Sequence, residues 1–204
     1  MPPPTIVYLH GFRSSPASGK ARELAEAVAR LPDVQRPRLC IPALADRPAQ
    51  AMASILALAD DTPEEALTFV GSSLGGYYAT FAAEKTGARA VLINPAVRPA
   101  DDLAPYKGLQ TNLHTGATFE VTERHFDEFR ALAVGAITRP CRYLLFVQSG
   151  DEVLAYREAI AFYAGAWQSV EGGGDHAFQG FTRHITTILR YCGVGGEPGF
   201  VQCT

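Results

Sequence analysis

Short apolar runs and longer amphipathic stretches alternate along most of the chain. The apolar runs are rich in β-branched and aromatic residues and end at turn-forming residues, a pattern typical of buried strands. Runs that predict strands cover residues 5–9, 37–41, 67–71, 89–93, 142–148 and 166–170. Stretches that predict helices cover residues 18–31, 47–59, 74–86, 122–133, 152–163 and 177–191. This alternation predicts an α/β protein with a mostly parallel sheet of about six strands and helices on both faces.

One segment, at about residues 95–140, interrupts this alternation. Its first part, residues 98–118, is too polar and too rich in Gly and Pro for a core helix. Long segments of this kind in compact domains usually carry function, so we expect a short lid-like insertion. Four side chains in its second half either line an acyl pocket or form an ordinary buried helix face, and both interpretations stay open. They are Phe119, His125, Phe126 and Phe129.

Composition indicates one compact domain spanning residues 1–204. With 47% hydrophobic and 19% charged residues, the chain can bury a full core without a second domain. A net charge of −3 and scattered basic residues argue against nucleic acid as a partner. No apolar run is long enough to span a membrane, and the start of the chain, Met-Pro-Pro-Pro, does not resemble a signal peptide. We therefore expect a cytoplasmic protein that does not insert into membranes.

The cysteines and histidines give no sign of a cofactor or a metal. The four cysteines, Cys40, Cys141, Cys192 and Cys203, form no C-x-x-C pair, which favours reduced thiols, although a bridge between Cys192 and Cys203 stays open. Residues 172–177 match part of a dinucleotide-binding motif, but no later strand with a ribose-binding acid follows. The histidine spacing matches no metal-ligand motif. We expect neither a cofactor nor a metal.

Residues 71–75, Gly-Ser-Ser-Leu-Gly, have the pattern G-x-S-x-G between an apolar run and a helical stretch. This pattern is typical of a nucleophile elbow, a tight strand-to-helix turn that holds a serine in a strained conformation with its Oγ exposed. A Cβ at Gly71 or Gly75 would prevent the helix from lying close to the strand that it leaves. Ser73 is therefore the candidate nucleophile, and a Gly-rich turn without catalytic function is the alternative.

An acid and a histidine follow Ser73 in the chain order that such a site requires. Asp151 and His176 each come directly after a predicted strand, so all three residues are expected at the same edge of the sheet. His176 is then the candidate base, and the carboxylate of Asp151 would orient its imidazole. In the alternatives, Asp151 caps the following helix and His176 packs against Phe178. Asp175 is a poor orienting partner, because it adjoins the histidine in the chain.

Two backbone N–H groups are expected to face a developing oxyanion. One belongs to Leu74, the residue after the candidate nucleophile. The other is expected from the loop after an early strand, where residues 10–12, His-Gly-Phe, follow the first apolar run. We assign this second donor to Phe12. The alternative is an ordinary turn in which His10 is a hydrogen-bonded loop residue.

Five blocks of the sequence carry a resemblance to a known family. They are His10-Gly-Phe-Arg-Ser-Ser-Pro16 with Ser18 and Lys20, Gly71-Ser-Ser-Leu-Gly-Gly76, Asn94-Pro-Ala-Val97, Ser149-Gly-Asp-Glu-Val153 and Glu171-Gly-Gly-Gly-Asp-His-Ala-Phe178. Together, and in this order, they resemble the small bacterial YqiA-like esterases of the α/β-hydrolase superfamily. The combination is far more specific than any single block.

This resemblance implies an α/β-hydrolase fold and a cytoplasmic serine esterase that acts on short acyl esters or thioesters. It also implies that Ser73, Asp151 and His176 form the catalytic triad. The departure is Asp175, where a small or amide residue is expected, and its charge would make His176 available as a base only at higher pH. A non-catalytic binding or interaction protein with the same fold is the alternative function. The sequence does not indicate an oligomeric state.

Overall fold

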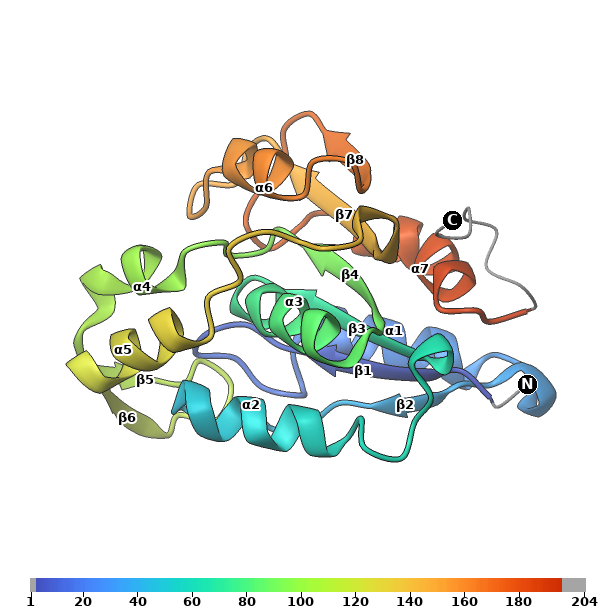
Figure 1. The fold of residues 1–204 in the computed structure, drawn as a ribbon, viewed down its shortest axis with the longest axis horizontal. Coiled ribbons are helices and arrows are strands. Elements are labelled where there is room, and N and C mark those ends of the chain that lie inside the picture. Colours follow the sequence, from blue (N-terminus) through green and yellow to red (C-terminus); the bar gives the residue numbers. More distant parts are fainter. Residues whose placement is uncertain (1–2, 196–204) are drawn as a thin grey trace.

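A parallel sheet forms the centre of the protein (Figure 1). The structure is a computed structural model that describes residues 3–195. The strand order is β2-β1-β3-β4-β7-β8, and every neighbouring pair is parallel. The strands are β1 Thr5–Leu9, β2 Arg38–Cys40, β3 Leu67–Ser72, β4 Arg89–Ile93, β7 Tyr143–Gln148 and β8 Trp167–Glu171. Each of the six apolar runs identified in the sequence became one of these strands, which confirms the predicted sheet.

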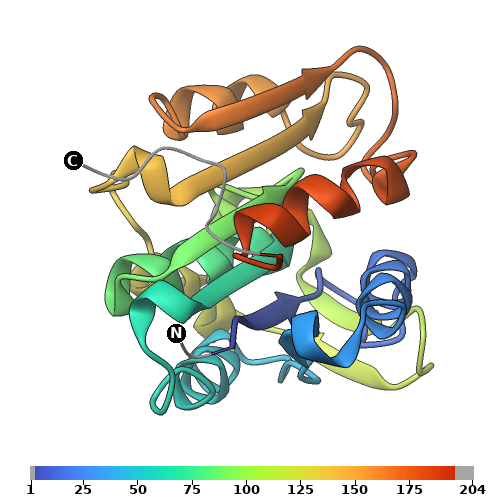
Figure 2. The ribbon, with the colours of Figure 1, turned by 90° about the vertical axis from the view of Figure 1, so that its right-hand side faces the viewer.

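Helices cover both faces of this sheet, as predicted (Figure 2). One face packs against α1 (Gly19–Ala29) and α7 (Ile185–Tyr191). The other packs against α2 (Pro48–Ala57), α3 (Leu74–Thr86), α5 (Glu123–Ala131) and α6 (Tyr156–Phe162).

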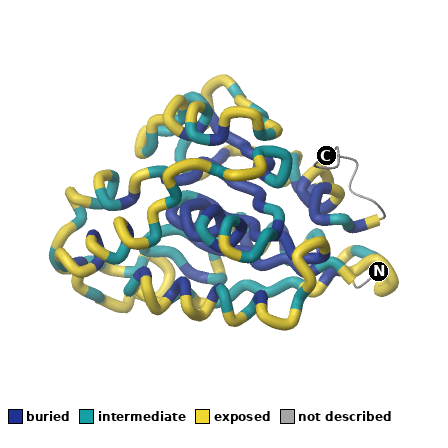
Figure 3. The backbone as a smooth tube through the Cα atoms, viewed as in Figure 1, coloured by how far each residue is buried: buried dark blue, intermediate teal, exposed yellow. Residues whose placement is uncertain are grey.

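Side chains along each strand point alternately to the two faces of the sheet, so each strand contributes to both cores. In β1, Ile6 and Tyr8 point into the core beneath α1, whereas Val7 and Leu9 point into the core beneath α3. Figure 3 shows the buried residues concentrated on the sheet and on the helix faces that meet it. Each fully buried aliphatic side chain contributes roughly 1.5–3 kcal/mol relative to an exposed one, so a charged substitution in β1 would break the fold.

Two helices begin later than the periodicity predicts. The predicted helix 152–163 is α6, which begins at Tyr156, because residues 151–154 form a turn closed by the carboxylate of Asp151. The predicted helix 177–191 is a loop, a short 3-10 turn and then α7. Phe178 has φ 65° and Gly180 has φ 71°, and this left-handed backbone prevents a continuous helix.

The insertion at 95–140 contains a hairpin that the sequence analysis did not predict. After the single turn α4 (Pro99–Asp102), β5 (Gly108–Thr111) and β6 (Thr118–Val121) form an antiparallel pair. Three hydrogen bonds join its tip to the loop after β1. They are Arg13 Nε to Thr111 O (2.9 Å), Leu113 N to Arg13 O (2.8 Å) and Asn112 Nδ2 to Ser14 O (2.7 Å). A lid function for the insertion stays a prediction.

The aromatic residues of α5 form a buried helix face. Phe126 and Phe129 lie in the core beneath α3, and the Tyr77 hydroxyl donates to the carbonyl of Phe129. His125 is buried in a capping box with Thr122 at the start of the helix. The buried-face interpretation therefore holds for these three residues, whereas Phe119 lies on β6 beside the loop after β1.

The cysteines correct one expectation. Cys40 and Cys192 are free thiols, which rules out the bridge between Cys192 and Cys203. Cys141 is disulfide-bonded, so the prediction of reduced thiols is wrong at this position. Cys203 lies outside the described residues. Between residues 3 and 195, no helix is both long enough and apolar enough to cross a membrane.

Candidate active site

Ser73 lies on a strained turn between β3 and α3. Its backbone has φ 56° and ψ −124°, a conformation that non-glycine residues rarely adopt. The Ser73 N–H donates to the Ile93 carbonyl at 3.0 Å, and the Ser73 carbonyl accepts from the N–H groups of Gly76 and Ala96. A Cβ at Gly75 would lie 2.0 Å from the Leu9 carbonyl oxygen. The close approach that the glycine spacing predicts is therefore present, and at Gly75 it is made against the neighbouring strand β1.

Three side chains from three loops meet at the carboxyl edge of the sheet. His176 Nε2 lies 3.0 Å from Ser73 Oγ, and His176 Nδ1 lies 3.0 and 2.9 Å from the two carboxylate oxygens of Asp151. A carboxylate only accepts, so we assign the ring proton to Nδ1, which leaves the lone pair of Nε2 facing the serine hydroxyl. The structure therefore brings together the three residues that the sequence analysis singled out.

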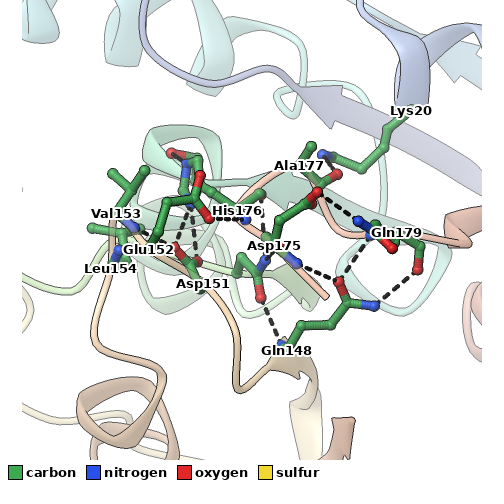
Figure 4. Close-up of polar contacts among 12 residues, drawn as sticks. Lys20, Gln148, Asp151, Glu152, Val153, Leu154, Asp175, His176, Ala177 and Gln179 are labelled. Carbon is green, nitrogen blue, oxygen red and sulfur yellow. Dashed lines mark hydrogen bonds and ion pairs between the residues drawn. The ribbon is translucent and has the colours of Figure 1, made fainter. Parts of the chain in front are cut away.

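Asp151 is almost fully buried, with 1% of its side chain exposed. Its Oδ1 also accepts the N–H groups of Val153 (2.9 Å) and Leu154 (2.8 Å), as Figure 4 shows. Burial alone would raise the pKa of Asp151, but the hydrogen bonds from His176 and from these two N–H groups outweigh it and lower the pKa. The carboxyl group is therefore ionised at neutral pH. It closes the turn after β7, but the N-cap of α6 is Ala155.

Asp175 and Phe178, the alternative partners of His176, make their side-chain contacts with other residues. Asp175 Oδ2 accepts from Gln179 Nε2 at 2.9 Å, and no hydrogen bond joins the side chains of Asp175 and His176 in the described part of the chain. The Phe178 ring packs edge-on against Phe146, with ring centroids 6.3 Å apart. This geometry favours Asp151 as the orienting acid.

The loop after β1 lies directly against Ser73. A Cβ at Gly11 would be 3.2 Å from Ser73 Cβ and 3.6 Å from Ser73 Oγ. Leu74 is the first residue of α3, where helix geometry leaves its N–H without an intrahelical partner. Within residues 3–195, the N–H groups of Leu74 and Phe12 have no acceptor. These two N–H groups lie on the two segments that meet at Ser73, and their role as oxyanion donors stays a prediction.

His10 holds this loop in place. Its Nδ1 donates to the Gly11 carbonyl (3.1 Å), and its Nε2 accepts the Leu44 N–H (3.3 Å). Burial lowers the pKa of His10, which fits a neutral ring with one donor and one acceptor. The Phe12 ring packs edge-on against Tyr106 and Phe119, with centroids 5.6 and 5.8 Å away. His10 is thus a hydrogen-bonded loop residue that holds the loop after β1.

A cavity of about 570 Å³ opens over Ser73 and His176. The hairpin tip supplies Leu113 and His114 to its wall, and the start of α1 supplies Lys20. Lys20 Nζ donates to the Ala177 carbonyl at 2.6 Å, directly after the histidine (Figure 4). The sequence analysis assigned none of these three a role: Leu113 and His114 lie on a hairpin that was not predicted, and Lys20 was named only as part of the family resemblance. Among residues 3–195, no group of three or more His, Cys, Asp or Glu side chains is placed to hold a metal ion.

The sheet order, the elbow and the cavity above it define an α/β-hydrolase fold. The chain belongs to the uncharacterised protein family UPF0227, whose profile matches residues 5–193, and the resemblance to the YqiA-like proteins is thereby confirmed.

Solved structures agree on the fold. A protein assigned as a hydrolase from Agrobacterium vitis S4 is 19% identical, with a TM-score of 0.71 over 93% of this chain and 88% of that chain. Mouse alpha/beta hydrolase domain-containing protein 10 is 17% identical, with a TM-score of 0.68 over 91% and 88%. Est1E from Butyrivibrio proteoclasticus is 14% identical, with a TM-score of 0.63 over 93% and 85%.

Proposed function

We propose that the protein is a serine esterase that hydrolyses short acyl esters or thioesters through an acyl-enzyme intermediate. The observation that carries this proposal is the continuous contact from Ser73 Oγ through His176 to Asp151, with 3.0 Å between Oγ and Nε2. Such a contact activates a hydroxyl that is otherwise a weak nucleophile. The cytoplasmic location expected from the sequence stays a prediction.

Acylation begins when Ser73 Oγ attacks the carbonyl carbon of the ester and His176 Nε2 takes the hydroxyl proton. Asp151 stabilises the imidazolium that forms, while the N–H groups of Phe12 and Leu74 donate to the oxyanion. His176 then gives its proton to the leaving alcohol or thiol as the bond to the carbonyl carbon breaks. In deacylation, water attacks the acyl carbon with His176 as base, the bond to Ser73 Oγ breaks, and His176 returns the proton to Oγ as the carboxylic acid leaves. Each oxyanion donor contributes about 10²–10³-fold to kcat.

A small-molecule ester fits the dimensions of the site. The cavity of about 570 Å³ is within the range of small-ligand pockets, and its wall combines apolar side chains such as Leu113 and Phe181 with many polar and charged ones. Est1E, which shares the fold, has been solved with ferulic acid bound. Assays with aryl esters and acyl thioesters of graded chain length will identify the preferred acyl group.

Covalent labelling by a fluorophosphonate tests the proposal directly, because the reaction requires both an activated serine and an oxyanion site. We expect one label per wild-type chain by intact mass, and none on Ser73→Ala, which also loses ester hydrolysis. Ser72→Ala is the matched control, since Ser72 is the neighbouring hydroxyl at the end of β3, and we expect it to be labelled. A folded wild-type protein that is neither labelled nor active would instead support the non-catalytic alternative.

A further inference from the structure

The loop that carries His176 has little intrinsic rigidity. Three consecutive glycines, Gly172 to Gly174, connect β8 to the histidine, and Gly173 and Gly174 have φ values of 74° and 73°. Fixing the backbone of one residue costs about 1–2 kcal/mol, and glycine loses the most freedom. A base must nevertheless stay within hydrogen-bond reach of its nucleophile, so other groups must hold this loop.

Gln148, the last residue of β7, binds this loop on both sides of the histidine. Only 2% of Gln148 is exposed. Its Oε1 accepts the N–H groups of Asp175 (3.2 Å) and Gln179 (2.8 Å), and its Nε2 donates to the Gln179 carbonyl (2.8 Å), as Figure 4 shows. Nε2 also donates to Glu171 Oε2 at 2.8 Å. The approach is so close that a Cβ at Gly174 would lie 2.0 Å from Gln148 Oε1.

Asn94, which follows β4, holds the same loop from the next strand. It is also only 2% exposed. Its Nδ2 donates to the carbonyls of Asp175 (2.9 Å) and His176 (3.3 Å), and its Oδ1 accepts the Gln148 N–H at 3.0 Å. Two buried amides from adjacent strands therefore pair with the backbone on each side of the imidazole. A carboxylate at position 94 lacks the donor and would face two carbonyl oxygens.

Backbone strain singles out the same region. Within residues 3–195, the non-glycine residues with left-handed φ are Arg13, Ser73, Asn94 and Phe178. Arg13 lies on the loop after β1, next to Phe12, Ser73 is the proposed nucleophile and Phe178 lies on the histidine loop. Such conformations cost about 1–3 kcal/mol each and persist where the surroundings enforce them, typically at functional sites. Asn94, with φ 40°, shares this property although it lies outside the proposed triad.

We infer that Gln148 and Asn94 are positioning residues that keep His176 Nε2 aligned with Ser73 Oγ. The inference rests on the proposed function. Because misplacement by about 1 Å costs about 10²-fold in rate, loss of either amide should lower kcat far more than it changes KM.

Gln148→Met tests this inference, because it keeps the length of the side chain and removes every hydrogen bond to the loop. Gln168→Met is the matched control. Gln168 lies on β8 and donates to the carbonyls of Ile160 (3.1 Å) and Tyr163 (2.7 Å), away from the histidine loop. We expect kcat for an aryl ester and the rate of fluorophosphonate labelling to fall at least about tenfold in Gln148→Met, with KM within about twofold. Gln168→Met should keep both rates near those of the wild type.

Asn94→Asp provides a second test with the same criteria. Aspartate tolerates the left-handed backbone and matches asparagine in shape, so the change removes mainly the donor. The inference is overturned if the rates of Gln148→Met equal those of Gln168→Met, or if neither Gln148→Met nor Asn94→Asp folds, since the amides would then hold the sheet rather than the loop. Absence of labelling in the folded wild type would instead refute the proposed function.

Discussion

Gly75→Ala is expected to show whether activity and stability depend on the close approach of α3 to β1. The added Cβ would lie 2.0 Å from the Leu9 carbonyl oxygen and 2.8 Å from the His10 carbonyl oxygen, both backbone atoms of β1 and its loop. Ordinary contact begins at 3.4 Å, so α3 and β1 must separate by about 1.4 Å. Neither group is the end of a flexible side chain, and both elements belong to the core.

The magnitude follows from this displacement. Overpacking of this kind costs about 1–3 kcal/mol, which lowers Tm by about 2–12 °C in a domain of roughly 200 residues. The same movement separates the N–H of Leu74, on α3, from the N–H of Phe12, on the loop after β1. Misplacement by about 1 Å is expected to lower kcat/KM about 10²-fold.

The assay is a thermal melt and a steady-state rate on one aryl ester. Gly135→Ala is the control, because nothing lies within 4 Å of a Cβ at that position. If Gly75→Ala matches this control in both Tm and kcat/KM, the close approach is not what positions the two donors.

Two further predictions concern Asp151. Asp151→Asn should lower kcat about 10³–10⁴-fold, because the imidazole would adopt the wrong tautomer, whereas Asp175→Asn should change it less than about tenfold; the reverse order in steady-state kinetics would make Asp175 the orienting acid. The pKa of Asp151 is lowered in the folded state, so its contribution to stability is present above the unfolded value of about 3.9 and is lost as pH falls through the folded pKa. The wild type's free energy of unfolding in urea should therefore exceed that of Asp151→Asn by less and less as the pH falls from about 5 to below about 3.9. A difference that stays constant would show that this carboxyl is not coupled to folding.

The central sheet and the elbow could be predicted because their signals are local. Strands buried on both faces appear as continuous apolar runs, and G-x-S-x-G places Gly71 where β3 meets α3 and Gly75 where α3 meets β1. The hairpin of residues 108–121 was not predicted, because its strands are short and half-exposed and present no apolar run. The predicted starts of α6 and α7 were wrong. The turn closed by the Asp151 carboxylate and the left-handed residues after His176 do not alter the helical periodicity of the sequence.

The supporting amides were not predictable in the same way. Gln148 ends an apolar run and Asn94 precedes a proline, so each reads as an ordinary strand terminus. Their partners lie 27 and 81 positions further along the chain, and only the order of the strands brings them together. A polar residue at the carboxyl end of a fully buried strand is the one signal that points to such a role.

The position of β8 at the edge of the sheet ties activity to the stability of a single strand. In the order β3-β4-β7-β8, three inter-strand spacings, about 14 Å, separate the strand that leads to Ser73 from the strand that leads to His176. Among residues 3–195, β8 pairs with β7 alone, and Trp167 and Val170 on it are 46% and 49% exposed. Edge strands with exposed residues open at lower free energy than central ones. If β8 detached, His176 would move away from Ser73 while β3, the elbow and both helix layers of the core stayed folded. Loss of hydrolysis would then measure the stability of this edge strand and not that of the whole molecule.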